Sequence, residues 1–308
     1  MNEFELIAQL TRTLPSNASV IAGAGDDCAV LKAIEPGRSL LLKTDAIVEG
    51  IHFTKECPPE QIGHKALGRC LSDIAAMAGR PLAALITLAL PQDFDPEFIQ
   101  QIYAGMSRLA QQHGVAIVGG ETTTNPERML ISVCLLGDVA ADKCILRFGA
   151  KSGDALFVTG ELGGSLAEKH LEFEPRLAEA QWLAGHFAIH SMIDISDGLA
   201  GDLRHLLQAG TVGAELMASA IPISRAARTQ GRAKGKPPLL GALSDGEDFE
   251  LLFTVAGRDA VPLLDGWKKQ FPTLRLSCIG RITSTPGLKL RDKTGIRTLE
   301  AHGYVHFA

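Results

Sequence analysis

The chain has 308 residues, enough for two domains or one large domain, and its 46% hydrophobic and 21% charged residues are typical of soluble globular proteins. Its formal net charge of −5 shows no overall footprint of nucleic-acid binding, and no run approaches the ~18 apolar residues of a membrane-spanning helix. The six cysteines contain no CxxC pair, which argues against a zinc site or a disulfide scaffold, and the polar start of the chain is unlike a secretory signal. We therefore expect a cytoplasmic protein with reduced thiols.

Acidic residues recur between residues 23 and 73, each beside small residues or at the end of a predicted element. Asp27 lies in Gly-Ala-Gly-Asp-Asp, Thr44-Asp45 ends a predicted buried strand over 39–45, and Asp73 borders the apolar face of a helix that starts after Pro58. Carboxylates gathered in one place repel one another unless a cation joins them, and hard divalent cations prefer oxygen ligands. The stretch predicts a magnesium-phosphate site, although the first of these motifs alone also fits an ordinary acidic turn.

The next elements continue an α/β pattern. Residues 82–90 are apolar enough for a strand in the middle of a sheet, and Asp95-Pro96 caps a helix that runs to about residue 113. A short buried strand over 115–118 leads into Gly-Gly-Glu-Thr-Thr-Thr at 119–124, which has the outline of a phosphate or metal loop and also fits a surface hairpin. We place a domain boundary near residue 149.

The second half repeats the combination of acids and glycines at element junctions. A strand over 155–159 enters a glycine-rich turn at 160–165, which is not a P-loop because no GxxxxGK[ST] occurs. Asp194-Ile-Ser196-Asp197-Gly lies where a strand meets a helix, so its two acids can face a cation while the helix start faces phosphate. Asp197 also fits a simple helix cap. A third acidic turn, at 245–250, precedes an apolar strand.

Taken in order, the blocks GDDCAVL, KTDAIVEGIHF, LSDIAAMAG, GGETT, LRFGAKSGD, VTGELGGS, IDISDGL, GEDFELLFTV and GYVHF resemble the thiamine-monophosphate kinase family. This family shares a superfamily with aminoimidazole ribonucleotide synthetase, selenophosphate synthetase and a hydrogenase-maturation dehydratase. The resemblance runs from residue 4 to residue 307, so it is far more specific than any single block.

The resemblance implies a two-domain α/β fold of the aminoimidazole ribonucleotide synthetase-like type. Residues 1–148 would form an ATP- and magnesium-binding domain that also makes a homodimer, and residues 149–308 would cover the cleft and complete the nucleotide and substrate site. ATP would phosphorylate thiamine monophosphate to thiamine diphosphate by direct in-line transfer with several Mg²⁺ ions. No nucleic-acid or membrane partner is implied.

The same resemblance transfers roles to individual residues. No general base is assigned, because the attacking phosphate oxygen is already anionic. The magnesium ligands would be Asp27, Thr44, Asp45, Asp73, Glu121, Asp194 and Asp197; the nucleotide contacts Tyr103, Gly120, Glu121, Arg147 and Ser196; and the substrate contacts His52, Glu247 and Tyr304.

Three positions depart from the family pattern. Glu121 stands where Asp is usual, Lys43 replaces a small hydroxyl residue, and Asp245 replaces a glycine whose position would cost about 1 kcal/mol if it required a positive φ. Two alternatives stay open at this stage. One is a sibling ATP-dependent enzyme of the superfamily, and the other is a catalytically inactive nucleotide-binding scaffold.

Overall fold

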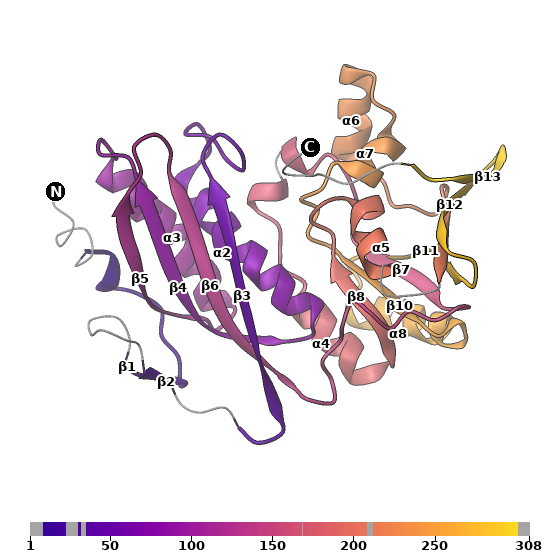
Figure 1. The fold of residues 1–308 in the computed structure, drawn as a ribbon, viewed down its shortest axis with the longest axis horizontal. Helices are drawn as coiled ribbons and strands as arrows, with labels where there is room; N and C mark the ends of the chain where they lie inside the picture. The colour runs from indigo at the N-terminus through magenta and orange to yellow at the C-terminus, as the bar shows by residue number, and fades with distance from the viewer. Residues whose placement is uncertain (1–8, 23–29, 32–34, 168, 208–211, 301–308) are drawn as a thin grey trace. The chain divides into compact units, whose positions relative to one another are not determined.

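The computed structural model describes residues 9–22, 30–31, 35–167, 169–207 and 212–300. The chain forms two compact units. Unit 1 comprises Met1–Ile74 and Gly79–Asp142, and unit 2 comprises Ala75–Ala78 and Lys143–Ala308. Each unit is built on its own sheet with helices packed against it, so the predicted α/β class is confirmed (Figure 1).

Unit 1 contains a four-stranded sheet in the order β3-β6-β4-β5. The pairs β3–β6 and β6–β4 are antiparallel, and β4–β5 is parallel. Helices α2 and α3 lie against one face of this sheet (Figure 1). The elements are β3 (Arg38–Val48), α2 (Pro59–Ala76), β4 (Arg80–Leu90), α3 (Pro96–Gln112), β5 (Ala116–Thr124) and β6 (Leu130–Ala140), while β1 (Val20–Ala22) and β2 (Val30–Leu31) form a separate pair.

Glycines let α2 and α3 pack closely together. A Cβ added at Gly63 would lie 1.9 Å from the carbonyl oxygen of Ile102, and one added at Gly105 would lie 1.8 Å from that of Glu60. The start of α3 is as predicted, because Asp95 accepts a hydrogen bond from Glu97 N at 2.9 Å. The predicted interior position of β4 is also confirmed, since it lies between β6 and β5.

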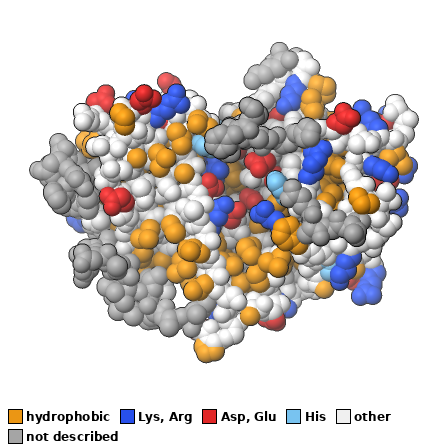
Figure 2. All heavy atoms as spheres, in the orientation of Figure 1, with side chains coloured by type: hydrophobic (Ala, Val, Ile, Leu, Met, Phe, Trp, Pro, Cys, Tyr) orange, Lys and Arg blue, Asp and Glu red, His pale blue; other side chains and the backbone are white. Residues whose placement is uncertain are grey.

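The prediction that β3 is buried was wrong for one of its two faces. Leu41 and Ile47 point toward the helices and are 7% and 1% exposed, but Leu40 and Leu42 are 56% and 75% exposed. An apolar run cannot distinguish a strand covered on both sides from one covered on a single side, because neighbouring residues point to opposite faces. Leu40, Leu42 and the 44%-exposed Leu85 of β4 mark what we call the open sheet face. Figure 2 shows hydrophobic side chains gathered over this part of the molecule.

The predicted loop at 119–124 is instead the second half of β5. Strand β5 continues through the glycine pair and stays parallel to β4 as far as Leu90↔Thr124. A Cβ at Gly120 would lie 1.8 Å from Ile86 O, so glycine permits the two backbones to approach closely. The register shifts beside Leu85, which shows that the glycines produce a bulge rather than a chain reversal.

Unit 2 contains a seven-stranded sheet in the order β13-β12-β9-β11-β7-β10-β8. Only the β12–β9 pair is parallel among the pairs described in this sheet. Its strands are β7 (Ala155–Thr159), β8 (Ile189–Asp194), β9 (Gly213–Met217), β10 (Leu251–Val255), β11 (Leu276–Thr283), β12 (Gly287–Asp292) and β13 (Gly295–Thr298). Its helices are α4 (Leu177–His186), α5 (Leu199–Leu207), α6 (Arg225–Lys234), α7 (Pro238–Ser244) and α8 (Ala260–Gln270), with short 3₁₀ turns at Ser165–Ala167, Lys169–Leu171 and Gly257–Asp259.

Both faces of the centre of this sheet are covered. Every residue of β7 is buried. Leu156 and Val158 join a core cluster that includes residues of α5 and α7. Phe157 points to the opposite face and stacks on Phe253 with ring centroids 5.6 Å apart. The sheet is therefore the middle layer of unit 2, and the ends of its strands carry the polar groups described below.

The described cysteines agree with the expectation of reduced thiols. Cys57, Cys70, Cys134, Cys144 and Cys278 are all free. Within the described ranges, no helix is both long enough and apolar enough to cross a membrane.

Candidate functional site

Four charged side chains from β3 and α2 form two ion pairs in unit 1. Lys43 Nζ lies 2.9 Å from Asp73 Oδ2. Arg69 donates from Nε and Nη2 to the two carboxylate oxygens of Asp45, at 3.1 and 3.2 Å. Lys43 and Asp45 are two residues apart on β3, so their side chains lie on the same side of the strand. Arg69 and Asp73 are four residues apart on α2, so their side chains lie on the same side of the helix. Two predicted metal ligands, Asp45 and Asp73, are thus brought together, each with a cationic side chain beside it.

Burial and charge together set the protonation of this cluster. Burial raises the pKa of Asp73, although the attraction of Lys43 opposes that rise. Burial also opposes the charge of Lys43, but attraction to Asp73 raises its pKa, so the ammonium stays charged. Burial, and then the charges of Asp45 and Asp73, raise the pKa of the neighbouring Cys70 thiol. Cys70 is therefore a protonated packing group and not a nucleophile.

Two other predicted metal ligands of unit 1 lie on the open sheet face. Thr44 directly precedes Asp45 on β3, so their side chains point to opposite faces. Glu121 pairs with Thr87, and both Thr87 and Ala46 pair with the same residue of β6, so Glu121 and Ala46 lie on one face of the sheet. Ala46 is two residues after Thr44, so Thr44 lies on that face as well. The side chains of Thr44 and Glu121 are therefore not gathered with those of Asp45 and Asp73.

The remaining predicted contacts of unit 1 are held by local hydrogen bonds or by packing. Nδ1 of His52 accepts a hydrogen bond from Val48 N at 3.1 Å, so a neutral ring carries its proton on Nε2. The fully buried Lys65 donates to His52 O at 2.7 Å and fixes the backbone there. Tyr103 is half-buried on α3, and burial raises its pKa, so its hydroxyl is a donor.

Three acids meet where β8 leads into α5 in unit 2. Asp194 ends β8 and is 6% exposed, and Asp202 lies on α5 at 2% exposed. A carboxylate oxygen of Asp202 accepts a hydrogen bond from Asp197 N at 3.0 Å. Burial, and then the charges of Asp194 and Asp197, raise the pKa of Asp202 to about 8. Sequence reasoning missed Asp202, but an acid between Leu199 and Leu203, on the buried side of a helix, was the available signal.

A second loop runs along this junction and is joined to it by backbone hydrogen bonds. Glu247 N donates to Ser196 O at 2.7 Å, and Phe249 N donates to Ile195 O at 2.8 Å. Glu247 and Phe249 have left-handed φ values of 54° and 50°, which non-glycine residues rarely adopt. Nδ1 of His170 lies 3.0 Å from the Glu247 carboxylate. The structure therefore brings predicted substrate contact Glu247 next to predicted nucleotide contact Ser196.

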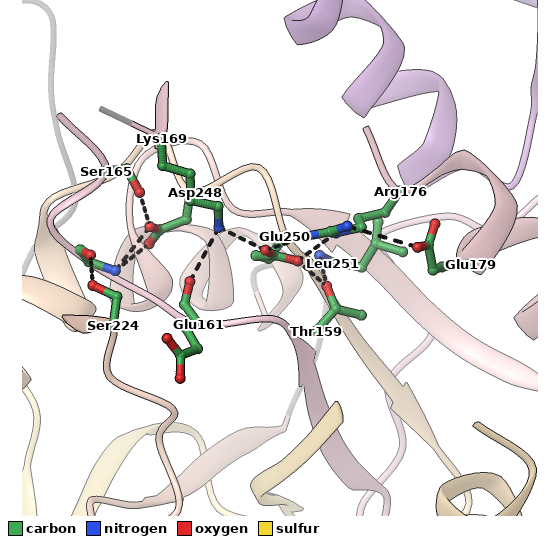
Figure 3. Close-up of polar contacts among 11 residues, drawn as sticks. Thr159, Glu161, Ser165, Lys169, Arg176, Glu179, Ser224, Asp248, Glu250 and Leu251 are labelled. Carbon is green, nitrogen blue, oxygen red and sulfur yellow. Dashed lines mark hydrogen bonds and ion pairs between the residues drawn. The ribbon is translucent and has the colours of Figure 1, made fainter. Parts of the chain in front are cut away.

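Glu250 anchors this second loop through buried charge (Figure 3). Its carboxylate lies 2.7 Å from Lys169 Nζ and accepts two hydrogen bonds from Arg176, at 2.8 and 2.9 Å. Thr159 Oγ1 donates to the same carboxylate at 2.7 Å. Burial opposes ionisation of Glu250, but the attraction of Lys169 and Arg176 lowers its pKa. Two cations thus neutralise, and one hydroxyl hydrogen-bonds to, an acid that is 1% exposed.

Asp248 ties the loop to the glycine-rich turn at 160–165 (Figure 3). Its two oxygens lie 2.9 and 3.0 Å from Gly163 N, and Ser165 Oγ donates to it as well. Burial raises the pKa of Asp248 to about 6. Of the four acids of the 245–250 turn, Glu247 is the one that the prediction assigns to substrate, whereas Asp245, Asp248 and Glu250 hold the loop in place.

The other predicted site residues are placed as follows. Ser196 is half-buried at the β8–α5 junction, and Arg147 is exposed. Asp27 and Tyr304 lie outside the described residues.

Comparison with known proteins identifies the family of this chain. The family AIR synthase related protein, N-terminal domain, matches residues 25–139. The thiamine-monophosphate kinase of Rhodopirellula baltica is 40% identical over 304 residues, which cover 96% of this chain and 93% of that relative. The chain belongs to the thiamine-monophosphate kinase family.

Two solved structures extend the comparison to three dimensions. Thiamine-monophosphate kinase from Stenotrophomonas maltophilia K279a has a TM-score of 0.80 and 30% identity, covering 99% of this chain and 98% of its own. AaThiL complexed with AMPPCP and TMP has a TM-score of 0.77 and 29% identity, covering 99% and 96%. The fold inferred from the sequence blocks is therefore the fold of the thiamine-monophosphate kinase family.

Two departures from the pattern of the thiamine-monophosphate kinase family have structural answers. Asp245 has φ −72° and ψ −33°, so the considered cost of a positive φ does not arise. Its carboxylate instead accepts a hydrogen bond from Gly164 N at 3.1 Å and pairs with Lys236. Lys43 pairs with Asp73, as described above.

The fit of Mg²⁺, which membership in the thiamine-monophosphate kinase family implies, differs between the units. In unit 2, Asp194 and Asp197 are a pair of acids with the oxygen ligands that a hard divalent cation prefers, and their charges raise the pKa of Asp202 beside them. In unit 1, the carboxylates of Asp45 and Asp73 have cationic side chains against them. Among the described residues, no three or more His, Cys, Asp or Glu side chains form a group that could hold a metal ion.

Proposed function

We propose that this chain transfers the γ-phosphoryl group of ATP to thiamine monophosphate and so produces thiamine diphosphate. One observation carries the proposal. The chain matches thiamine-monophosphate kinases over nearly its whole length, including AaThiL complexed with AMPPCP and TMP. AMPPCP is an ATP analogue, so that complex holds both reactants of such a transfer in stable form.

The chemistry asks mainly for positioning and neutralisation of charge. The phosphate oxygen of thiamine monophosphate is already an anion near neutral pH, so it attacks without a general base. Two phosphate groups must approach in line despite their negative charges, which requires cations and fixed donors around them. Mg²⁺, when bound, supplies part of that positive charge.

Acidic side chains among the described residues are suited to bind Mg²⁺. We assign Asp194 and Asp197 as ligands, and Asp202 as the buried acid that holds Asp197 through its backbone N–H. The start of α5 directly follows and directs backbone N–H groups toward the same junction. The full assigned set is Asp27, Thr44, Asp45, Asp73, Glu121, Asp194 and Asp197 for magnesium and Tyr103, Gly120, Glu121, Arg147 and Ser196 for the nucleotide.

We assign His52, Glu247 and Tyr304 to thiamine monophosphate. The Nε2–H of a neutral His52 ring is a donor suited to phosphate, because Nδ1 is engaged by Val48 N. The Glu247 carboxylate is an acceptor suited to the amino group of the aminopyrimidine. Tyr304, outside the described residues, would supply an aromatic face to the thiamine rings.

We further propose that the enzyme is a homodimer joined through the open sheet face. Leu40 and Leu42 of β3 and Leu85 of β4 are exposed on that face, and covering them would remove apolar area from water. A second copy of the chain is the simplest partner, because a two-fold axis makes one apolar patch meet its equivalent. Light scattering should report a dimer, and Leu42→Lys should shift it to monomer; a native monomer would refute this assignment.

The direct test is product formation from ATP, Mg²⁺ and thiamine monophosphate, with chromatographic detection of thiamine diphosphate. Selenide and the aminoimidazole precursor serve as parallel substrates. Product from thiamine monophosphate alone supports the proposal. Turnover of another substrate identifies a sibling enzyme, and ATP binding without any turnover identifies an inactive scaffold. We place the reaction in the cytoplasm, with which the free described cysteines agree.

A further inference from the structure

The acidic cluster of unit 1 carries its own counter-charge. Asp45 and Asp73 contribute two negative charges, and Arg69 and Lys43 contribute two positive ones, so the four side chains sum to zero. The arrangement is built into the fold, because two charges come from one side of β3 and two from one side of α2. Its sequence signature is a base and an acid two apart on a strand, and another base and acid four apart on a helix.

These ion pairs are not loose surface contacts. The side chain of Arg69 is 14% exposed and that of Asp45 is 21% exposed. Lys43 and Asp73 are 35% and 27% exposed. Arg69 holds both oxygens of Asp45 with two donors of its planar guanidinium, a geometry that fixes the carboxylate. Partial exclusion of water strengthens the attraction relative to fully exposed pairs.

A lysine ammonium at this place competes with a metal ion. Its Nζ lies 2.9 Å from Asp73 Oδ2, the distance of direct contact. An ammonium and a Mg²⁺ on one carboxylate would be a few ångströms apart and would repel each other strongly.

We propose that Lys43 is a built-in cation that takes the place of one of the several Mg²⁺ ions by contacting Oδ2 of Asp73, so that Oδ1 is the oxygen by which Asp73 acts as the magnesium ligand assigned above; Arg69 holds the neighbouring Asp45. The inference rests on the proposed function, since it concerns the ions that accompany ATP. It makes Lys43 a positioning residue that fixes the orientation of the Asp73 carboxylate. The chain should therefore bind fewer divalent ions with nucleotide than a variant with a small or apolar residue at position 43.

The test counts bound ions directly and does not depend on turnover. Mn²⁺ serves as the probe, because free and bound Mn²⁺ are distinguished by electron paramagnetic resonance, and AMPPCP serves as the nucleotide. We expect Lys43→Ser and Lys43→Met each to bind about one more Mn²⁺ per chain than the native protein at saturation. Lys43→Arg, which keeps the charge, should match the native count. Lys55→Ser is the matched control, since Lys55 is a 65%-exposed lysine of the same unit.

Equal Mn²⁺ counts in native protein, Lys43→Ser and Lys43→Met would overturn the proposal, as would an added ion in Lys43→Arg. Circular dichroism and urea unfolding confirm that each variant is folded, and Lys43→Met retains the apolar stem if Lys43→Ser is unstable. A native chain that makes no thiamine diphosphate, while Lys43→Ser gains an ion, would refute the proposed function and leave this inference standing. Product formation with unchanged counts would refute only the inference.

Discussion

Nδ1 of His170 lies 3.0 Å from Oε2 of Glu247, and the backbone of Glu247 has a φ of 54°. A non-glycine residue in this region costs on the order of 1–3 kcal/mol, so it persists only where its surroundings impose it. Here the backbone N–H of Glu247 donates to Ser196 O at 2.7 Å. The backbone and the carboxylate of Glu247 are therefore each held by a different partner, which fixes the orientation of the acid.

Replacing His170 should weaken binding of thiamine monophosphate and spare ATP. His170→Ala removes the group against the Glu247 carboxylate, and we expect the KM for thiamine monophosphate to rise roughly 5- to 10-fold. The measurement is steady-state kinetics with each substrate varied in turn. Glu247→Gly is the companion variant, because glycine accepts the positive φ but lacks the carboxylate. If His170 acts through Glu247, adding His170→Ala to Glu247→Gly should change the KM no further, whereas additive losses would refute the coupling.

Replacing Glu250 should destabilise unit 2. Glu250→Gln leaves Lys169 and Arg176 without their buried counter-charge, and breaking such a cluster costs about 3–5 kcal/mol. Urea unfolding monitored by tryptophan fluorescence should detect the loss, since Trp182 and Trp267 both lie in unit 2. Glu161→Gln is the control, because Glu161 is 49% exposed and 4.0 Å from Arg275. Equal stability of the two variants would contradict the anchoring role of Glu250.

Asp248 should make the free energy of unfolding depend on pH. Its pKa is raised from 3.8 to about 6 by burial, so between these values the folded protein keeps a proton that the unfolded chain has released. The free energy of unfolding should therefore fall as pH rises through this window, by about 3 kcal/mol at most. Asp248→Asn should flatten that part of the profile. An unchanged slope would show that Asp248 is ionised throughout.

The pKa of Glu250 is shifted in the opposite direction and acts in a separate window. Because its folded-state pKa lies below 4.5, its contribution to stability is present above that value and is lost as pH falls through the folded-state pKa. Asp248→Asn should therefore not change the loss of unfolding free energy at low pH that Glu250 causes.

Asp45→Asn should abolish phosphoryl transfer and also lower stability. Removing one acid from a cluster of repelling carboxylates would not destabilise the protein without bound metal. Asp45, however, accepts two hydrogen bonds from Arg69, and the substitution weakens them. We expect a loss of about 1 kcal/mol, because the pair is partly solvated. Product assays measure the loss of phosphoryl transfer, and urea unfolding measures the loss of stability. Ser39→Ala is the control, because Ser39 is exposed on the same strand. Full activity of Asp45→Asn would refute its assignment as a metal ligand.

The sequence alone indicated the family and the structure of those elements whose signals are local. Ordered blocks of glycines, acids and apolar strands predicted the α/β class, and the structure confirmed elements whose signals are local, such as the Asp95-Pro96 start of α3. These predictions succeeded because a helix cap or an apolar period is decided by residues within a few positions of one another.

Only the tertiary structure decided which acids are paired and which strand face is open. Lys43 of β3 contacts Asp73 of α2, and Glu250 contacts Arg176, which is 74 residues earlier in the sequence. The exposure of Leu42 likewise depends on what covers the sheet and not on the strand itself. Charge pairing and burial are properties of atoms brought together by folding, so residue type and spacing could nominate the acids of this site but could not assign their partners.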